Sequence, residues 1–174
     1  FFDNQEVNEM SIKNLRVRDP QAIAGKHVIA YVDGSYSEGN YAYAVTLRPE
    51  TNDQTEFQKP AIVEVNACRK FHELSNVSCE LEACYRAIKL AQEYGASSIT
   101  VYTDYEVIVH LINGEARPKN WEVARFVKEL EAFKIPFKVE HVRGHAGNKY
   151  NREVDILARQ AVRKLCRQTS KGGV

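Results

Sequence analysis

Four acidic residues, spread over most of the chain, have the side-chain type that a shared metal site requires. They are Asp33 in VDGS, Glu80 in SCELEA, Asp104 in VYTD and Asp155 in NREVDILA. Carboxylates that converge repel one another and take up protons unless a cation neutralises them. Their hard oxygen atoms favour Mg²⁺ or Mn²⁺ over zinc. Two such ions about 4 Å apart can activate a water and stabilise the leaving oxygen in phosphodiester cleavage, and we expect the four acids to form such a site.

Taken one at a time, each acid also has an ordinary explanation. Asp33 precedes Gly34, and Asp-Gly is a common turn sequence. Glu80 lies near the start of an expected helix, where an acid favours the helix dipole whatever its function. Asp155 can be a solvated helix residue. The metal-site hypothesis therefore depends on the whole set and on the elements that carry it.

The periodicity of the sequence predicts these elements. Runs rich in β-forming residues predict strands at 27–32, 41–47, 61–71, 98–103 and 137–142. Helical spacing predicts a helix with Ser78 as N-cap and Gly95 past its end, helices at 106–112 and 121–133, and a long last helix capped by Asn151. The order βββαβααβα predicts an α/β fold, with a mixed five-stranded sheet and helices on both faces.

The same pattern predicts how the chain is divided and where the acids lie. We expect a linker or arm at residues 1–26, one domain at 27–168 and a C-terminal tail at 169–174. Asp33 is then expected at the carboxyl end of the first strand, where Gly34 allows a sharp turn, and Asp104 at the end of the fourth strand. If those two strands are neighbours, the acids can converge beyond the strand ends.

Composition limits the class of protein. A chain of 174 residues with 44% hydrophobic residues can bury the core of one domain, and its net charge of +1 leaves nucleic-acid affinity to local basic patches. The four cysteines form no CxxC pair, which favours free thiols in an intracellular, cytoplasmic protein. No apolar run approaches the roughly 20 residues of a membrane helix. We expect a monomer, and the start at Phe1 suggests a piece of a longer protein with an upstream domain.

The four motifs, in this order and spacing, resemble those of type 1 ribonuclease H over residues 28–162. The most specific part is RGHAGNKYNREVDILA, in which a Gly-His-Ala-Gly loop leads into a helix with a fixed Asp. The resemblance implies the ribonuclease H-like fold, with 27–168 as the catalytic domain. It also implies a metal-dependent endoribonuclease that hydrolyses the RNA strand of an RNA–DNA hybrid duplex by a two-metal mechanism, with two Mg²⁺ ions or Mn²⁺ in their place.

The resemblance also implies a role for each residue of the site. Asp33 would bridge both metals, Glu80 and Asp104 would hold one ion, and Asp155 would hold the other. His145 would assist proton transfer or product release, a task that suits a histidine near its ordinary pKa. Taken alone, His145 can equally be a surface loop residue.

Expected substrate contacts follow less directly from the motifs. Ser75 and Asn76 match family positions that touch the DNA phosphate and the RNA 2′-hydroxyl, and Asn120 matches a phosphate-pocket position. Ser35 in VDGS and Asn151, which would support the loop and the catalytic water, complete the expected set. The alternative is that Ser75 and Asn76 are turn residues and that Asn120 caps the helix that starts at 121.

One departure from the family pattern affects substrate binding. The long basic extension between the two middle helices is absent, and only GEARPKN, at 114–120, remains. Basic residues of the last helix can compensate, or the N-terminal arm can lead to a separate binding domain. These basic residues are Arg159, Arg163, Lys164, Arg167 and Lys171. They can also be an ordinary solvated face.

Three alternatives to a free-standing enzyme stay open. The same domain can belong to a reverse transcriptase or another fusion protein, or it can be a non-catalytic module that binds hybrids. A metal-dependent exonuclease or integrase of similar fold is the third, although its carboxylate contexts differ from GHAG and NREVD.

Overall fold

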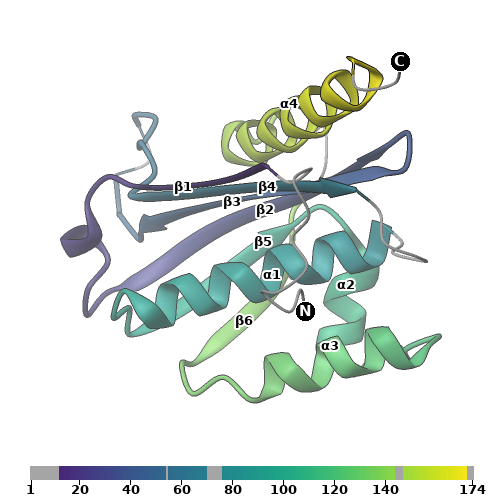
Figure 1. Cartoon of the computed structure of the whole chain (residues 1–174). Helices are drawn as coiled ribbons and strands as arrows, with labels where there is room; N and C mark the ends of the chain where they lie inside the picture. The colour runs from purple at the N-terminus through teal and green to yellow at the C-terminus, as the bar shows by residue number, and fades with distance from the viewer. Residues whose placement is uncertain (1–11, 54, 70–75, 144–146, 172–174) are drawn as a thin grey trace.

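The computed structural model describes residues 12–53, 55–69, 76–143 and 147–171, which form one sheet with helices on both of its faces (Figure 1). The strands are β1 (Ile12–Val17), β2 (His27–Ser37), β3 (Asn40–Pro49), β4 (Ile62–Arg69), β5 (Ser98–Thr103) and β6 (Phe137–His141). The helices are η1 (Pro20–Ala22, a 3₁₀ turn), α1 (Asn76–Glu93), α2 (Glu106–Ile112), α3 (Trp121–Glu131) and α4 (Lys149–Lys171). The expected α/β fold with a mixed sheet is confirmed. Within the described ranges, no helix is both long and apolar enough to cross a membrane.

The strands lie in the order β1-β4-β3-β2-β5-β6. The meander of β2, β3 and β4 is antiparallel, whereas β5 and β6 are parallel to β2. The first and fourth strands of the predicted order, now β2 and β5, are therefore neighbours.

The strand count is a correction, because the sequence predicted five strands. Residues 12–17, which were assigned to the arm, form β1 and pair antiparallel with β4 at the sheet edge. The segment IKNLRV contains two cations and an Asn, so its apolar pattern is weak. Polar edge strands of this kind are common, since charged side chains discourage pairing with further chains.

The extent of β2 is a second correction. Asp33 was expected at a strand end, but β2 continues to Ser37 and pairs Asp33 with Ala44 of β3. The chain reverses at Glu38 and Gly39, between the strands predicted at 27–32 and 41–47. Their φ angles of 51° and 76° match the tight turns that suit a two-residue hairpin. Gly34 therefore lies inside a strand and does not form a turn.

The start of α1 differs from the prediction, whereas its end agrees with it. α1 begins at Asn76, so Ser78 is not its N-cap. Gly95, with φ +77°, does end this helix: it donates to Gln92 O at 3.2 Å while Ala96 donates to Ala91 O at 2.9 Å.

The cap of α4 was also assigned to the wrong asparagine. Asn148 Oδ1 accepts hydrogen bonds from the backbone N–H groups of Tyr150 at 3.0 Å and Asn151 at 3.1 Å, so it satisfies the free donors of the first turn. Asn151 lies inside the helix, where its side chain can point toward the sheet. At its other end α4 continues to Lys171, into the expected tail.

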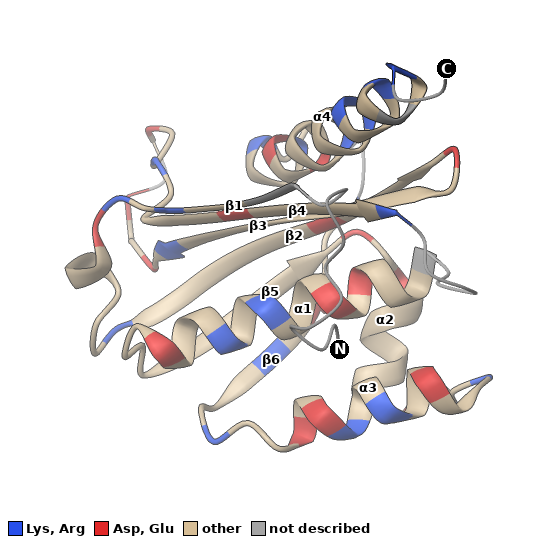
Figure 2. Ribbon diagram, viewed as in Figure 1, with Lys and Arg blue, Asp and Glu red and all other residues tan. Residues whose placement is uncertain are grey.

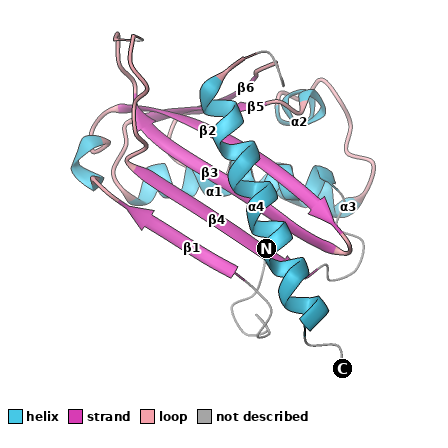
Figure 3. Ribbon diagram, turned by 90° about the horizontal axis from the view of Figure 1, so that it is seen from above, coloured by secondary structure: helices cyan, strands magenta, loops and turns pink. Residues whose placement is uncertain are grey.

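Two apolar layers hold the helices to the sheet. Val28, Ala30 and Val32 of β2 belong to the large core beneath α1, α2 and α3. The intervening Tyr31 packs on the other face, with Val154 and Ala158 of α4. This alternation follows from the period of two in a strand, and α4 consequently crosses the face opposite α1 (Figure 3).

Arg48 of β3 fastens the start of α4 to the sheet. Its side chain is 2% exposed and donates to Glu153 Oε1 and Gln58 O, both at 2.7 Å, and to Thr46 Oγ1 at 2.9 Å. The guanidinium carbon also lies 4.3 Å from the centre of the Tyr150 ring. A buried cation with this many partners fixes the first turns of α4, and therefore the position of Asp155, relative to the sheet.

We expect Arg48→Ala to lower the free energy of unfolding by about 3–5 kcal/mol, because it leaves Glu153 and the buried carbonyl and hydroxyl acceptors without their donor. Urea denaturation measures this change. Arg125→Ala is the matched control, since its ion pair with Glu129 lies on the surface and such pairs contribute about 0–1 kcal/mol. Equal losses in the two variants would show that Arg48 is no anchor.

Candidate active site

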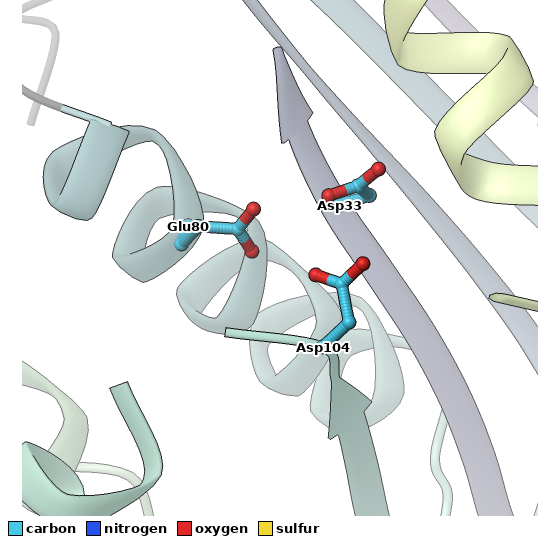
Figure 4. A group of neighbouring side chains, drawn as sticks. All are labelled: Asp33, Glu80 and Asp104. Carbon is cyan, nitrogen blue, oxygen red and sulfur yellow. The ribbon is translucent and has the colours of Figure 1, made fainter. Parts of the chain in front are cut away.

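Three carboxylates from separate elements meet at one point. Asp33 comes from β2, Glu80 from α1, and Asp104 directly follows β5. One oxygen of each lies within 4.8 Å of the others. Figure 4 shows the three side chains pointing toward one another from the strand, the helix and the strand end. The predicted convergence of these three acids is therefore present.

The register of β2 and β5 explains why Asp33 and Asp104 are neighbours. The last parallel pair joins Tyr31 to Tyr102. Each Asp lies two residues beyond this pair, and residues two apart in a strand point to the same face. β5 ends at Thr103, so the edge of β2 that pairs with β5 has no neighbouring strand at the level of Asp33. The two carboxylates consequently share the space beyond the end of β5.

Gly34 brings the third carboxylate close. A Cβ at this position would lie 3.0 Å from Cys79 Cβ and 3.2 Å from Glu80 Oε1, so only glycine lets α1 pack so near to β2. The Gly34 N–H donates to Glu80 Oε1 at 2.9 Å, and the Thr103 hydroxyl donates to Glu80 Oε2 at 3.3 Å. Glu80 is thus oriented from both strands.

The electrostatics of this cluster are unfavourable without a cation. Asp33 and Glu80 are each 6% exposed. Burial, followed by repulsion from Glu80 and Asp104, raises the pKa of Asp33 well above its ordinary range, and burial also raises the pKa of Glu80. A divalent cation would remove both causes, because it replaces water as the partner of the oxygens and cancels their charge. The residues therefore fit a hard divalent metal.

Asp155 lies in the same cleft but outside this trio. The cleft has a volume of about 350 Å³. Besides the trio it is lined by Gly34, Ser35, Tyr36, Tyr105, Asp155 and Arg159. Asp155 Oδ1 accepts from Arg159 Nε at 2.9 Å. The structure therefore joins three of the four expected acids closely and places the fourth on α4, the wall beside β2.

Of the other expected site residues, two lie at or near the cleft, one caps a helix, and three fall wholly or partly outside the described residues. Asn151 is 4% exposed, its Nδ2 lies 3.5 Å from Asp104 Oδ2, and its buried Oδ1 has no hydrogen-bond partner within the described ranges. Ser35 lines the cleft. Asn120 caps α3 by accepting from the Val123 N–H at 2.9 Å, as the alternative interpretation had it. Ser75, His145 and the side chain of Asn76 lie outside the described residues.

Sequence reasoning did not anticipate how three residues contribute to the cleft. The hydrogen bond from Thr103 to Glu80 and the close approach of α1 to Gly34 depend on how β2, β5 and α1 pack together, and no local sequence pattern predicts this packing. Arg159 had a readable signal, because it follows Asp155 by four residues and such pairs face each other on a helix.

The comparisons with known proteins agree with this geometry. The family model described as RNase H matches residues 25–163, most of the chain. The chain belongs to the RNase H family. No curated protein matched the chain significantly.

Solved structures of RNase H proteins share the fold. The N-terminal RNase H domain of rv2228c from Mycobacterium tuberculosis superposes with a TM-score of 0.63 at 16% identity, over 83% of this chain and 99% of that one. RNase H1 from Halobacterium salinarum gives 0.58 at 22% identity, over 78% and 96%. LC11-RNase H1, solved in complex with an RNA/DNA hybrid, gives 0.60 at 19% identity, over 79% and 97%.

The raised pKa values predict how the stability of the metal-free protein depends on pH. Folded Asp33 and Glu80 hold protons at pH values where the unfolded chain has released them. The unfolded chain is therefore favoured increasingly as pH rises from about 4, the ordinary carboxyl pKa, toward the raised values.

We expect the free energy of unfolding of the wild-type protein in EDTA to fall as pH rises from about 5 to 8. In Asp33→Asn it should fall less steeply, with a slope that is smaller by up to about 1.4 kcal/mol per pH unit. Urea titrations at several pH values measure the two slopes. Asp53→Asn, an exposed loop residue, is the control and should keep the wild-type slope above about pH 5, where the carboxylate is ionised in both states. Parallel curves for wild type and Asp33→Asn would contradict the prediction.

Proposed function

We propose that the protein is a Mg²⁺-dependent endoribonuclease that hydrolyses the RNA strand of RNA–DNA hybrids. The observation that carries the proposal is the carboxylate trio, in which one oxygen of each acid lies within 4.8 Å of the others, in a chain of the RNase H family. LC11-RNase H1, which has the same fold and was solved in complex with an RNA/DNA hybrid, supports the choice of substrate class.

The four acids have distinct parts in this proposal. Asp33 would serve both ions, and Glu80 and Asp104 would complete one of the two sites with it. Asp155, on α4 in the same cleft, would serve the second ion. When bound, two such cations supply an activated water and charge stabilisation of the leaving oxygen. Mn²⁺ has the same preference for oxygen ligands and is expected to substitute.

The remaining residues hold these acids and the substrate in place. The Gly34 N–H and the Thr103 hydroxyl restrict the rotation of Glu80. Asn151 lies against Asp104, and its Oδ1, which has no hydrogen-bond partner among the described residues, is a candidate acceptor for a water. Ser35 lines the cleft beside Asp33, where it can contact the substrate. His145 remains a proposed proton carrier, as its place in the GHAG motif implies.

The test is cleavage of a labelled RNA–DNA hybrid beside matched duplex DNA and duplex RNA, with Mg²⁺ or EDTA. We expect Mg²⁺-dependent cuts within the RNA strand of the hybrid alone. Asp33→Asn, Glu80→Gln and Asp104→Asn should each lower kcat/KM by about 10³-fold or more, since each removes several kcal/mol of charge stabilisation. Glu131→Gln, at an exposed position of α3, should keep wild-type activity.

Two outcomes would refute the proposal. Wild-type rates in the folded Asp33→Asn variant, or cleavage that persists in EDTA, would exclude the carboxylate trio as the reacting site. Hybrid binding by the wild-type protein without any cleavage would instead identify a non-catalytic hybrid-binding module.

A further inference from the structure

A second cleft continues the catalytic one along the same two elements. The catalytic cleft is lined by β2 up to Tyr36 and by α4 up to Arg159. The second is lined by the next residues of the hairpin, Ser37 and Glu38, and by the following turns of α4, from Arg163 to Lys171. Because the walls follow on in sequence on both sides, the two clefts adjoin and together line the space between β2 with its hairpin turn and α4. We call it the α4 groove.

The hairpin wall of the α4 groove is held against the helix. Asn40 Nδ2 lies 3.2 Å from Cys166 Sγ, and Cys166 Sγ lies 3.5 Å from the Ser37 carbonyl oxygen. These contacts join the two ends of the hairpin turn to α4. The groove therefore has two fixed walls near its distal end.

Cations recur along the helical wall of the groove. Arg159, Arg163, Arg167 and Lys171 follow one another at four-residue intervals, and all four line one of the two clefts. Four-residue steps keep side chains on one side of a helix, and twelve residues span roughly 18 Å. No acid follows Asp155 in α4, and Figure 2 shows the resulting basic bands along the distal part of the helix.

Ordinary explanations cover only part of this row. A favourable interaction with the helix dipole applies to the last turn, which contains Lys171 alone. Arg159 pairs with Asp155. For Arg163 and Arg167, the described part of the chain provides no ion-pair partner, although both side chains are exposed beside the groove. Glu38 is the acid on the facing wall.

We propose that the α4 groove binds the phosphodiester backbone of the RNA strand next to the cleaved bond. This inference rests on the proposed function, because the strand that reaches the carboxylates must continue into an adjoining space. Arginine suits this task, since its planar guanidinium donates two parallel hydrogen bonds to a phosphate. At about 3.4 Å of axis per nucleotide, the roughly 18 Å row matches about five nucleotides. The row would supply binding energy that the absent basic extension cannot.

The first arm of the test compares two charge-matched variants. The groove variant combines Arg163→Gln, Arg167→Gln and Lys171→Gln, and omits Arg159 because it borders the catalytic acids. The control combines Lys26→Gln, Lys128→Gln and Lys134→Gln, which are exposed positions outside both clefts. On a hybrid of about 18 base pairs, the groove variant should raise KM about tenfold and leave kcat within about twofold. The slope of log kcat/KM against log salt should flatten by about 2–3, because three phosphate contacts are lost.

The second arm uses a hybrid of about 6 base pairs, too short to fill both the catalytic cleft and the row of about five nucleotides. Here the groove and control variants should have the same KM. Equal KM values for the two variants on the long hybrid would overturn the groove inference while leaving the proposed function intact. Absence of any hybrid cleavage by the wild-type protein would overturn both.

Discussion

Repulsion among three closely spaced carboxylates, two of them buried, is the constraint around which this fold is arranged. Asp33, Glu80 and Asp104 lie closer together than free carboxylates would remain, and two of them are almost fully removed from water. Such an arrangement is unfavourable in the absence of a cation. It persists because other interactions hold the elements that carry the acids. These are the parallel pairing of β2 with β5, the close packing of α1 against Gly34, and the hydrogen bonds that Gly34 and Thr103 donate to Glu80.

The two faces of the sheet contribute separately to the site. On one face, the large apolar core fixes α1 and with it Glu80. On the other, the smaller core beneath α4 is supplemented by the buried Arg48, which joins the first turns of that helix to β3. Asp155 and the cations of the α4 groove belong to this second layer. The trio and the fourth acid are thus attached to the sheet by different means, and the cleft lies where the two layers meet.

The sequence predicted those parts of the fold that depend on local chemistry. The period of two and the helical spacing predicted the central strands and helices, and the motifs identified the three acids that converge. Asp33 was misplaced because Asp-Gly is a turn signal, whereas here Gly34 makes room for Cys79 and Glu80. The cap of α4 was misassigned because Asn148 and Asn151 have equal capping ability, and only the structure shows which one accepts from the helix. Arg48 gave no local signal, since its partners lie at 46, 58 and 153.

The most direct test of the cation-dependent site is a calorimetric titration of the metal-free protein with Mg²⁺, near pH 7, in buffers of different ionisation enthalpy. Because burial and repulsion raise the pKa of Asp33 and Glu80, Mg²⁺ must displace protons when it binds. We predict proton release by the wild-type protein, with much weaker binding and less release in Asp33→Asn. Binding of equal strength in that variant, or wild-type binding without proton release, would contradict a metal site built on this trio.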